Sequence, residues 1–270
     1  LKRLDVTGSP KRAISTRLSL LALQSNVLGE VPQPGAAHTG RAASAHQTGV
    51  VRLIAFTPGT SFSDSGQRQG AATERALVAI LLEQLAPPTP EQAEATLVMF
   101  QGSVSSPQRL RTHYIEPMRK QLASGIDPRI TRAFTYLVRG TGLLPRFVAL
   151  RERLIGQESL EGENWHEAQE VMAGMRQALA KAGVEALRPD LVILDEFQRF
   201  RQLLDDPDGS PAAELAHELF GANGCKVLLL SATPYKSFTY ADSGDDDHYR
   251  DFLAVVRFLA GGAPEAAERV

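Results

Sequence analysis

Hydrophobic and polar positions along this chain follow two patterns that predict two kinds of element. Three short runs are apolar almost throughout: residues 50–56, 190–194 and 225–230. Runs of this kind are typical of strands in a parallel sheet whose two faces are covered by helices. Apolar residues recur at helical spacing in three other segments: 71–186, 212–220 and 249–260. The alternation of the two patterns predicts an α/β fold.

Proline and capping residues set the expected helix boundaries within residues 71–186. The helix that follows Ala71 is expected to end at Pro87-Pro88, and Thr89-Pro90-Glu91 combines a cap, a proline at the first position and an acid in the first turn. A long helix is expected over Trp165–Leu187, with one apolar side formed by Val171, Met175, Leu179 and Val184. The apolar run 17–24 fits a buried strand or the end of a helix equally well.

Composition and charge narrow the class of protein. The chain has 270 residues, of which 43% are hydrophobic and 22% charged, so a wholly disordered, collagenous or coiled-coil protein is excluded. Its 29 basic and 31 acidic residues give a net charge of -2, and no overall basic character indicates a nucleic-acid partner. Residues 109–153, however, carry ten basic and three acidic residues, a local excess of +7. This excess indicates either solvated helix faces or a surface that contacts a polyanion.

The single cysteine and the absence of long apolar runs indicate in which cellular compartment the protein is expected. Cys225 has no partner for an intramolecular disulfide, which favours a reducing compartment, and no apolar run reaches the roughly 18 residues of a membrane span. We therefore expect a cytoplasmic protein with no membrane partner. The chain begins Leu1-Lys2-Arg3, without an initiator methionine or a signal peptide, so we expect it to be processed or to start partway through a longer gene product.

Two adjacent carboxylates follow the second predicted strand. Asp195 and Glu196 stand at its carboxyl end, the edge at which open α/β sheets bind ligands. An Asp there suits Mg²⁺, and a neighbouring Glu suits the activation of water. The pair is also compatible with the start of a helix, where acids are favoured, and with an unrelated metal-dependent hydrolase.

The next predicted strand ends in Ser231-Ala232-Thr233-Pro234, so a hydroxyl pair is expected at the same sheet edge as the carboxylates. Together, Leu194-Asp195-Glu196-Phe197-Gln198-Arg199 and Leu229-Leu230-Ser231-Ala232-Thr233-Pro234 resemble motifs II and III of the superfamily 2 helicases, which include the DEAD/DEAH-box and Snf2-like motors. The resemblance implies that Asp195 coordinates Mg²⁺ with ATP and that Glu196 is the catalytic base. It also implies that Gln198 hydrogen-bonds toward Ser231 or Thr233, which couple the nucleotide state to nucleic-acid binding. Phe197 and Gln198 depart from the strict DEAD and DEAH boxes.

A third motif precedes these two in the chain. Thr57-Pro58-Gly59-Thr60 follows the first predicted strand and is similar to motif Ib of such motors, the loop that grips the nucleic-acid backbone. Backbone amides of a glycine turn and neighbouring hydroxyls suit a phosphate, which makes Thr57, Gly59 and Thr60 candidate contacts. The same tetrapeptide is also typical of an ordinary turn at the end of a strand.

The resemblance implies a whole architecture. Residues 1–70 and 187–270 are expected to form part of the first RecA-like motor domain, a three-layer fold around a parallel sheet, and residues 71–186 a basic helical insertion. Arg129, Arg132 and Arg139 are the insertion's candidate contacts to nucleic acid, DNA rather than RNA. The motifs are also similar to those of large bacterial helicase-related proteins, several of them linked to defence against foreign DNA.

The resemblance also implies what such a motor needs besides these motifs. A Gly-x-x-x-x-Gly-Lys-Ser/Thr loop and a second RecA-like domain are not found in the sequence. The parent protein is thus expected to be an ATP-hydrolysing helicase or translocase that uses ATP and Mg²⁺, while this chain alone is expected to be inactive. The alternative is a truncated or degenerate domain that binds nucleic acid or protein without ATPase activity.

Overall fold

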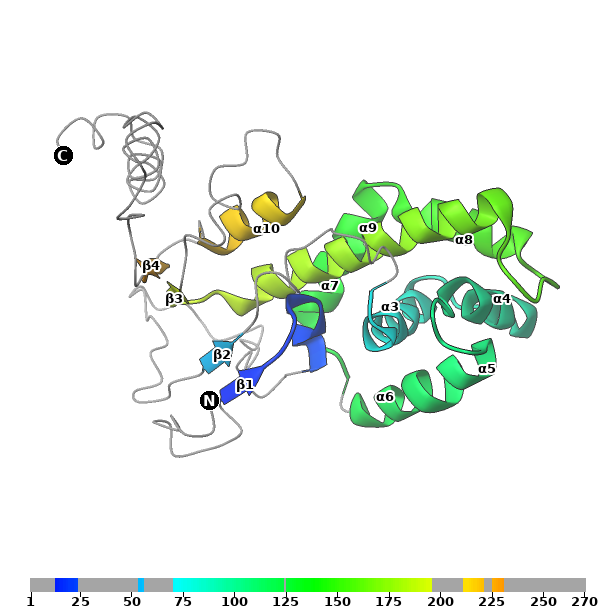
Figure 1. Cartoon of the computed structure of the whole chain (residues 1–270), viewed down its shortest axis with the longest axis horizontal. Coiled ribbons are helices and arrows are strands. Elements are labelled where there is room, and N and C mark those ends of the chain that lie inside the picture. The colour runs from blue at the N-terminus through cyan, green and yellow to red at the C-terminus, as the bar shows by residue number, and fades with distance from the viewer. Residues whose placement is uncertain are drawn as a thin grey trace, which may run out of the picture. The chain divides into compact units, whose positions relative to one another are not determined.

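The computed structural model describes residues 13–23, 53–55, 70–123, 125–195, 211–220 and 225–230. The chain divides into two compact units, residues 1–187 and 188–270. Figure 1 labels the helices and strands of both. The predicted grouping of residues 1–70 with residues 187–270 remains a prediction.

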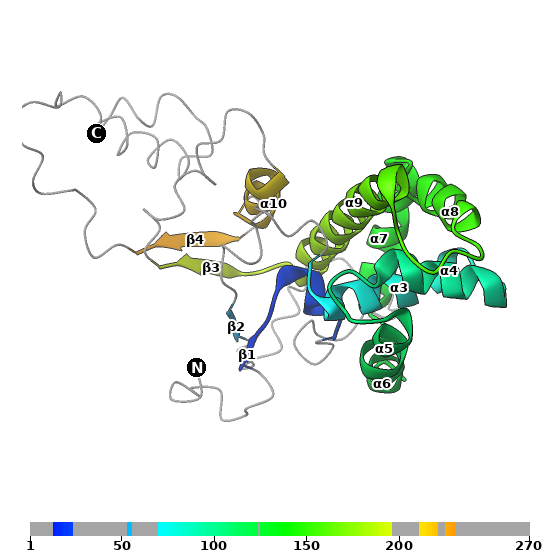
Figure 2. The ribbon, with the colours of Figure 1, turned by 45° about the vertical axis from the view of Figure 1, so that its right-hand side comes forward.

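Helices dominate the first unit. After the 3₁₀ helix η1 (Leu18–Leu23), the helices of its described residues are, in chain order, α3 (Ala72–Leu85), α4 (Pro90–Phe100), α5 (Pro107–Leu110), the π-helical turn η2 (Arg111–Ile115), α6 (Glu116–Gln121), α7 (Pro128–Gly140), α8 (Leu143–Arg153) and α9 (Gly162–Leu187). The long helix α9 is the centre of this bundle, because α3, α4, α7 and α8 all pack against it (Figure 2). The largest fully buried aromatic side chains of the core are Phe100, Phe134 and Phe147.

Local sequence signals explain where the helices begin. The side chain of Thr89 accepts a hydrogen bond from the Gln92 amide, while the Gln92 side chain accepts one from the Thr89 amide at 2.7 Å. This reciprocal capping box, with Pro90 at the first position, confirms the predicted start of α4. At α7 the carboxylate of Asp127 accepts from the Arg129 amide at 2.8 Å, and a proline again follows the cap.

The long helix was predicted with the correct apolar side. Val171, Met175, Leu179 and Val184 are all buried, and α9 begins at Gly162, three residues before the predicted start. Because α9 is covered by several helices, its buried surface is wider than one stripe and also includes Ala168, Met172, Ala178, Ala182 and Ala186.

A short parallel strand pair belongs to the same unit. β1 (Ala13–Ser15) pairs with β2 (Leu53–Ala55), so Ile14 lies opposite Ile54. The apolar run 17–24, for which strand and helix were both open, forms the 3₁₀ helix η1 (Leu18–Leu23). Leu18 and Leu21 of η1 are fully buried, and η1 packs against α9.

The second unit contains a strand–helix–strand sequence. β3 (Leu191–Leu194) is followed by α10 (Pro211–Phe220) and β4 (Lys226–Leu229). β3 and β4 are adjacent and parallel, with Leu191 opposite Lys226 and Leu194 opposite Leu229. The α/β class is therefore present as parallel strand pairs in a mostly helical chain. The helix expected over 249–260 lies outside the described residues.

The strands of this second unit differ from the prediction in one respect. Strands apolar throughout were expected to be buried on both faces, yet Leu191, Ile193, Leu228 and Leu230 are 42% to 54% exposed. Their side chains alternate along the strands and therefore share one face of the pair. The full burial that such a sequence pattern indicates is not reached by these residues.

Candidate functional site

Asp195 is the one predicted motor residue of the second unit that the structure describes. It directly follows β3 and is exposed. The Leu230 amide donates to the carbonyl oxygen of Leu194 at 2.9 Å, so the carboxyl ends of β3 and β4 lie level with one another. Asp195 is thereby placed at the edge of a parallel strand pair at which α/β proteins bind ligands.

The other predicted motif residues lie outside the described part of the chain. They are Glu196, Gln198, Ser231 and Thr233 of the motifs after β3 and β4, and Thr57, Gly59 and Thr60 of the segment after β2. The structure places the strands that precede them: Leu194 is two residues before Glu196, and Ala55 two residues before Thr57. Their side-chain arrangement remains a prediction.

Metal binding at Asp195 depends on how many side chains with donor atoms lie near it. Within the described ranges no group of three or more His, Cys, Asp or Glu side chains is arranged to hold a metal ion. Mg²⁺ commonly keeps several waters and is held by one or two carboxylates together with substrate phosphates. A single exposed carboxylate at a strand end fits that mode of binding, and it does not fit an all-protein cage.

Cys225 lies at the opposite end of the same strand pair. It precedes β4, and burial raises the pKa of its thiol, with the negative charge of Asp190 acting in the same direction. A raised pKa lowers the thiolate fraction, which is the reactive form. This environment is that of a structural cysteine.

The basic segment 109–153 is largely neutralised by its neighbours. Five of its arginines form ion pairs: Arg111 with Glu94, Arg119 with Glu83, Arg129 with Asp127, Arg146 with Glu170, and Arg153 with Glu167. Apart from Asp127, these acids lie on α3, α4 and α9, outside the segment. The local excess of +7 counted along the sequence is therefore not a surface charge of +7.

Arg151 is a sixth cation that is not available for binding. Its side chain lies in the core, where it donates to the Ala86 carbonyl oxygen at 2.9 Å and its guanidinium lies 5.2 Å from the centre of the Phe147 ring. Burial lowers the pKa of Arg151, and the charge of the neighbouring Glu152 opposes that effect. The residue joins α8 to the end of α3.

Four cations of the segment have no ion pair among the described residues: Arg109, Lys120, Arg132 and Arg139. All four are exposed. Two of them, Arg132 and Arg139, lie on one face of α7, together with Tyr136. Of the three predicted contacts on α7, Arg129 differs, because it is held against the buried carboxylate of Asp127 at 2.7 Å.

Tyr136 is a residue of this face that charge counting missed. It is 77% exposed, more than any other large hydrophobic side chain in the described part of the chain. The signal for it was present in the sequence, since positions 132, 136 and 139 follow the spacing of one helical face.

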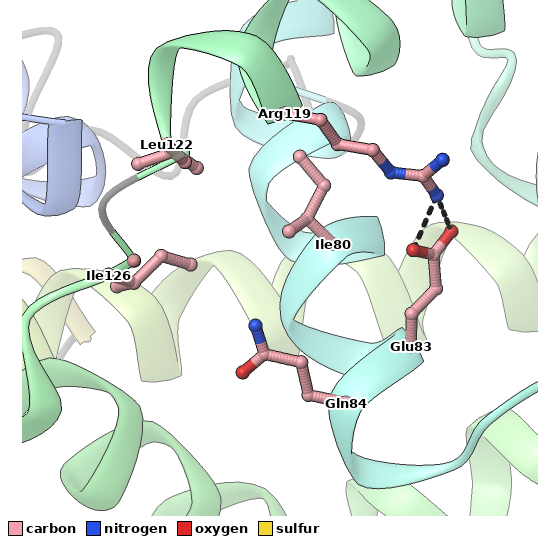
Figure 3. Close-up of a pocket in the computed structure, with 7 residues that line it drawn as sticks. Ile80, Glu83, Gln84, Arg119, Leu122 and Ile126 are labelled. Carbon is pink, nitrogen blue, oxygen red and sulfur yellow. Dashed lines mark hydrogen bonds and ion pairs between the residues drawn. The ribbon is translucent and has the colours of Figure 1, made fainter.

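A shallow cavity of about 320 Å³ lies between α3 and the connection from α6 to α7 (Figure 3). It is lined by Ile80, Glu83, Gln84, Arg119, Leu122, Gly125 and Ile126. Its charged groups bind each other, because one guanidinium nitrogen of Arg119 donates to both carboxylate oxygens of Glu83 (Figure 3). None of the predicted site residues lines this cavity, and it holds no nucleophile.

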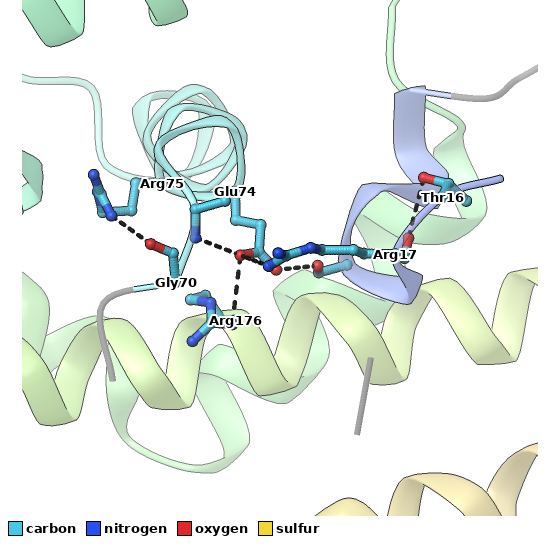
Figure 4. Close-up of polar contacts among 8 residues, drawn as sticks. Thr16, Arg17, Gly70, Glu74, Arg75 and Arg176 are labelled. Carbon is cyan, nitrogen blue, oxygen red and sulfur yellow. Dashed lines mark hydrogen bonds and ion pairs between the residues drawn. The ribbon is translucent and has the colours of Figure 1, made fainter. Parts of the chain in front are cut away.

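A buried polar cluster joins η1, α3 and α9 (Figure 4). The carboxylate of Glu74 accepts hydrogen bonds from Ser19 at 2.5 Å, from the Ala71 amide at 2.7 Å and from Arg17 at 3.1 Å, and Arg176 lies 3.4 Å away. Burial raises the pKa of Glu74, but the Ser19 hydrogen bond and the charges of Arg176 and Arg17 outweigh it, so the pKa is lowered. Every part of this arrangement stabilises an ionised carboxylate, which indicates a structural role.

Arg75 completes the polar interior beside this cluster. It is buried, and its guanidinium donates to the carbonyl oxygens of Gly70 at 2.6 Å, Phe100 at 2.8 Å and Gln101 at 3.2 Å. These carbonyls belong to the segment before α3 and to the end of α4. Arg75 therefore fixes two chain segments and is not directed to a ligand.

No protein-family model, curated protein or solved structure matches the chain. Any function proposed for the chain therefore depends on its own residues and on where the structure places them.

Proposed function

We propose that the chain is part of an ATP-dependent nucleic-acid motor, namely part of its first RecA-like domain with a helical insertion. The observation that carries the proposal is the register of β3 and β4. Asp195 follows β3 directly, and Ser231 and Thr233 follow β4 within four residues of its end, so motifs resembling II and III leave adjacent, parallel strands at one edge. The intervening α10 gives the strand–helix–strand order of such a fold.

In this proposal the chemistry belongs to the acids after β3. Asp195 would hold Mg²⁺, through which the phosphates of ATP would be bound, and Glu196 would accept a proton from the attacking water. Mg²⁺ supplies neutralisation of the charge that develops on the phosphoryl oxygens. Gln198, Ser231 and Thr233 couple the nucleotide site to nucleic acid.

Nucleic acid is contacted in this proposal by two surfaces. One is the Thr57–Thr60 turn, through Thr57, Gly59 and Thr60. The other is the outward face of α7, through Arg132 and Arg139. Arg129, the third candidate, holds the start of α7 through Asp127.

DNA-stimulated ATP hydrolysis by the protein that carries this chain tests the proposal. We expect Glu196→Gln to lower turnover by about 10²- to 10⁴-fold, the usual contribution of a general base, while ATP binding is retained. Asp195→Asn is expected to weaken binding of Mg²⁺–ATP as well. A matched control is Asp190→Asn, which changes an exposed acid at the other end of β3 and leaves the backbone bond of Asp190 to Lys226 intact.

Two results would contradict the proposal. One is the absence of nucleic-acid-stimulated hydrolysis in the unaltered protein. The other is equal turnover in Glu196→Gln and in the control Asp190→Asn, because Glu196 would then contribute no more to hydrolysis than an acid outside the site.

A second candidate is a nucleic-acid-binding module that does not use ATP. It is favoured by the pair of exposed arginines on α7, which needs no nucleotide to act. Binding of nucleic acid that persists with an unchanged affinity in Asp195→Asn and Glu196→Gln, in a protein without ATPase activity, would support it over the motor.

A further inference from the structure

We propose that Tyr136 is a stacking platform for a base of single-stranded nucleic acid, flanked by Arg132 and Arg139, which bind the phosphates on either side of that base. The inference depends on the nucleic-acid-binding part of the proposed function and is independent of the ATPase part. It adds a specific residue, a mode of contact and a preference for single strands.

The outward face of α7 has the geometry that such a platform needs. Tyr136 lies four residues after Arg132 and three before Arg139, so the two arginines are displaced from it along the helix axis by about 6 Å and 4.5 Å in opposite directions. All three side chains are exposed, and the Tyr136 ring is 77% accessible. A base on the ring would therefore have one arginine towards each of its two phosphates.

The opposite face of α7 makes this platform rigid. Ile130, Phe134 and Val138 are fully buried, and α7 packs on both α9 and α8. Its first turn is fixed by the Asp127 cap. An aromatic ring presented by a packed helix loses little conformational freedom on binding, which favours affinity.

The charge on this face selects a polyanion. Arg132 and Arg139 have no ion pair among the described residues, in contrast to five other arginines of residues 109–153. A ring between two such cations suits a ligand that alternates flat apolar groups with negative charges. Single-stranded nucleic acid has this alternation, and aromatic stacking on its bases is tolerant of sequence. In a duplex the flat faces of the bases are already stacked on one another and are closed to the ring.

Trp165 provides a contrasting aromatic residue in the same unit. It is 42% exposed at the start of α9, where its ring and that of His166 form a T-shaped pair with 4.8 Å between the ring centroids. Its sequence neighbour Glu163 gives this helix start a negative charge, which suits the helix but repels a polyanion, whereas the charge of Glu167 is paired with Arg153. Trp165 is therefore the matched control for Tyr136.

Fluorescence anisotropy with the whole chain and a labelled oligothymidylate of about 16 nucleotides tests the proposal. Tyr136→Ala is expected to weaken binding by about 5- to 150-fold, the range seen when one stacked base is lost. Tyr136→Phe is expected to bind like the unaltered chain, since it keeps the ring, and Trp165→Ala is expected to have no effect. A duplex of the same length should bind more weakly than the single strand, and Tyr136→Ala should not change its affinity.

The salt dependence of binding distinguishes the contribution of the Tyr136 ring from that of the two arginines. Arg132→Ala combined with Arg139→Ala should reduce the slope of log Kobs against log salt by about 1.4, since each single-strand phosphate contact contributes about 0.7. Tyr136→Ala should lower the affinity and leave the slope unchanged. An oligouridylate arm determines whether the strand is DNA or RNA, because stacking alone does not distinguish the two.

A spectroscopic variant reports contact directly. Trp165 is the single tryptophan, so Tyr136→Trp combined with Trp165→Phe moves the only tryptophan to the platform. Its fluorescence should be quenched by the oligothymidylate, whereas that of Trp165 in the unaltered chain should not change.

Four results would overturn the inference: no binding of any oligonucleotide, equal weakening by Tyr136→Ala and Trp165→Ala, equal weakening by Tyr136→Ala and Tyr136→Phe, or no quenching at position 136. Binding that is independent of Tyr136, in a protein with DNA-stimulated ATPase activity, would remove this inference and leave the motor standing. Binding through Tyr136 in a protein without ATPase activity would remove the motor and leave this inference standing.

Discussion

The hydroxyl of Ser19 donates a 2.5 Å hydrogen bond to the carboxylate of Glu74, and this contact joins the η1 segment to the first turn of α3. The two residues are 55 positions apart in the chain. The same carboxylate also binds Arg17 and Arg176, so one buried anion holds η1 and α9 to α3. The stability of the helical unit should therefore depend strongly on this acid.

Glu74→Ala is expected to lower the free energy of unfolding by about 3–5 kcal/mol, because it leaves two arginines and a hydroxyl without their buried partner. The matched control is Glu94→Ala on α4, whose carboxylate is largely exposed and pairs with Arg111 at the surface. Such a pair contributes about 0–1 kcal/mol. Urea denaturation followed by circular dichroism measures both, and equal losses would show that the buried cluster has no special role.

The lowered pKa of Glu74 predicts how stability changes with pH. A carboxylate whose pKa is lower in the folded state stabilises the fold above its unfolded pKa, and that contribution is lost as the pH falls through the folded value. The ordinary value is 4.5, so the loss should occur below about pH 4.5. In Glu74→Gln this part of the acid transition should be absent. The difference in unfolding free energy between the two proteins should shrink from pH 7 to pH 3, and a constant difference would contradict the assignment.

The helical part of the fold was accessible from sequence because its signals are local. Thr89 and Pro90 mark the start of α4, and the positions that α9 buries were read from their spacing. The 3₁₀ helix at Leu18–Leu23 was not resolved from sequence, since the short apolar run 17–24 has no distinguishing period. Its conformation is decided by packing against α9, which is a tertiary effect.

The candidate nucleic-acid surface was only partly accessible from sequence. Counting charges along the chain found Arg132 and Arg139 but gave the same weight to Arg119, which Glu83 of α3 neutralises. An acid 36 residues away in the chain is invisible to a window of sequence. Tyr136 was missed because exposure of an aromatic side chain depends on which face of α7 the neighbouring helices cover.

Two glycines of α9 should respond differently to substitution by alanine. A Cβ at Gly183 would come within 2.7 Å of the Leu18 backbone carbonyl oxygen, whereas one at Gly174 would meet the terminal methyl groups of Leu143 at 2.8 and 3.0 Å. Alanine favours a helix by about 1 kcal/mol over glycine, and a leucine side chain can rotate away. The η1 backbone has no such freedom, because its side chains are buried against α9.

Gly183→Ala is therefore expected to destabilise the chain by about 1–3 kcal/mol, the usual cost of overpacking, while Gly174→Ala should be within about 1 kcal/mol of the unaltered chain. Thermal and urea unfolding of the two variants side by side measure the difference. Greater stability of Gly183→Ala than of Gly174→Ala would mean that η1 does not approach α9 as closely as described.

The three arginines of α7 should have two different roles. Arg129 stabilises the helix, and Arg132 and Arg139 bind nucleic acid. Arg129 forms a fork with the buried Asp127 carboxylate, whose pKa is lowered because the hydrogen bonds and charge of Arg129 outweigh burial. Arg129→Ala is expected to lower the free energy of unfolding by about 1.5–3 kcal/mol, the usual value for a hydrogen bond to a charged group. Arg132→Ala, on the exposed face, should change it by less than about 0.5 kcal/mol.

For binding of the oligothymidylate, Arg132→Ala should have the larger effect and Arg129→Ala the smaller one. At a temperature where all variants are folded, Arg132→Ala should weaken binding and reduce its salt dependence, while Arg129→Ala should leave both close to those of the unaltered chain. The physical reason is that the charge of Arg129 is already satisfied by Asp127, so little of it is available to a phosphate. Equal effects of the two substitutions on binding would show that the Asp127 pair opens when nucleic acid binds, and would place Arg129 in the interface with Arg132 and Arg139.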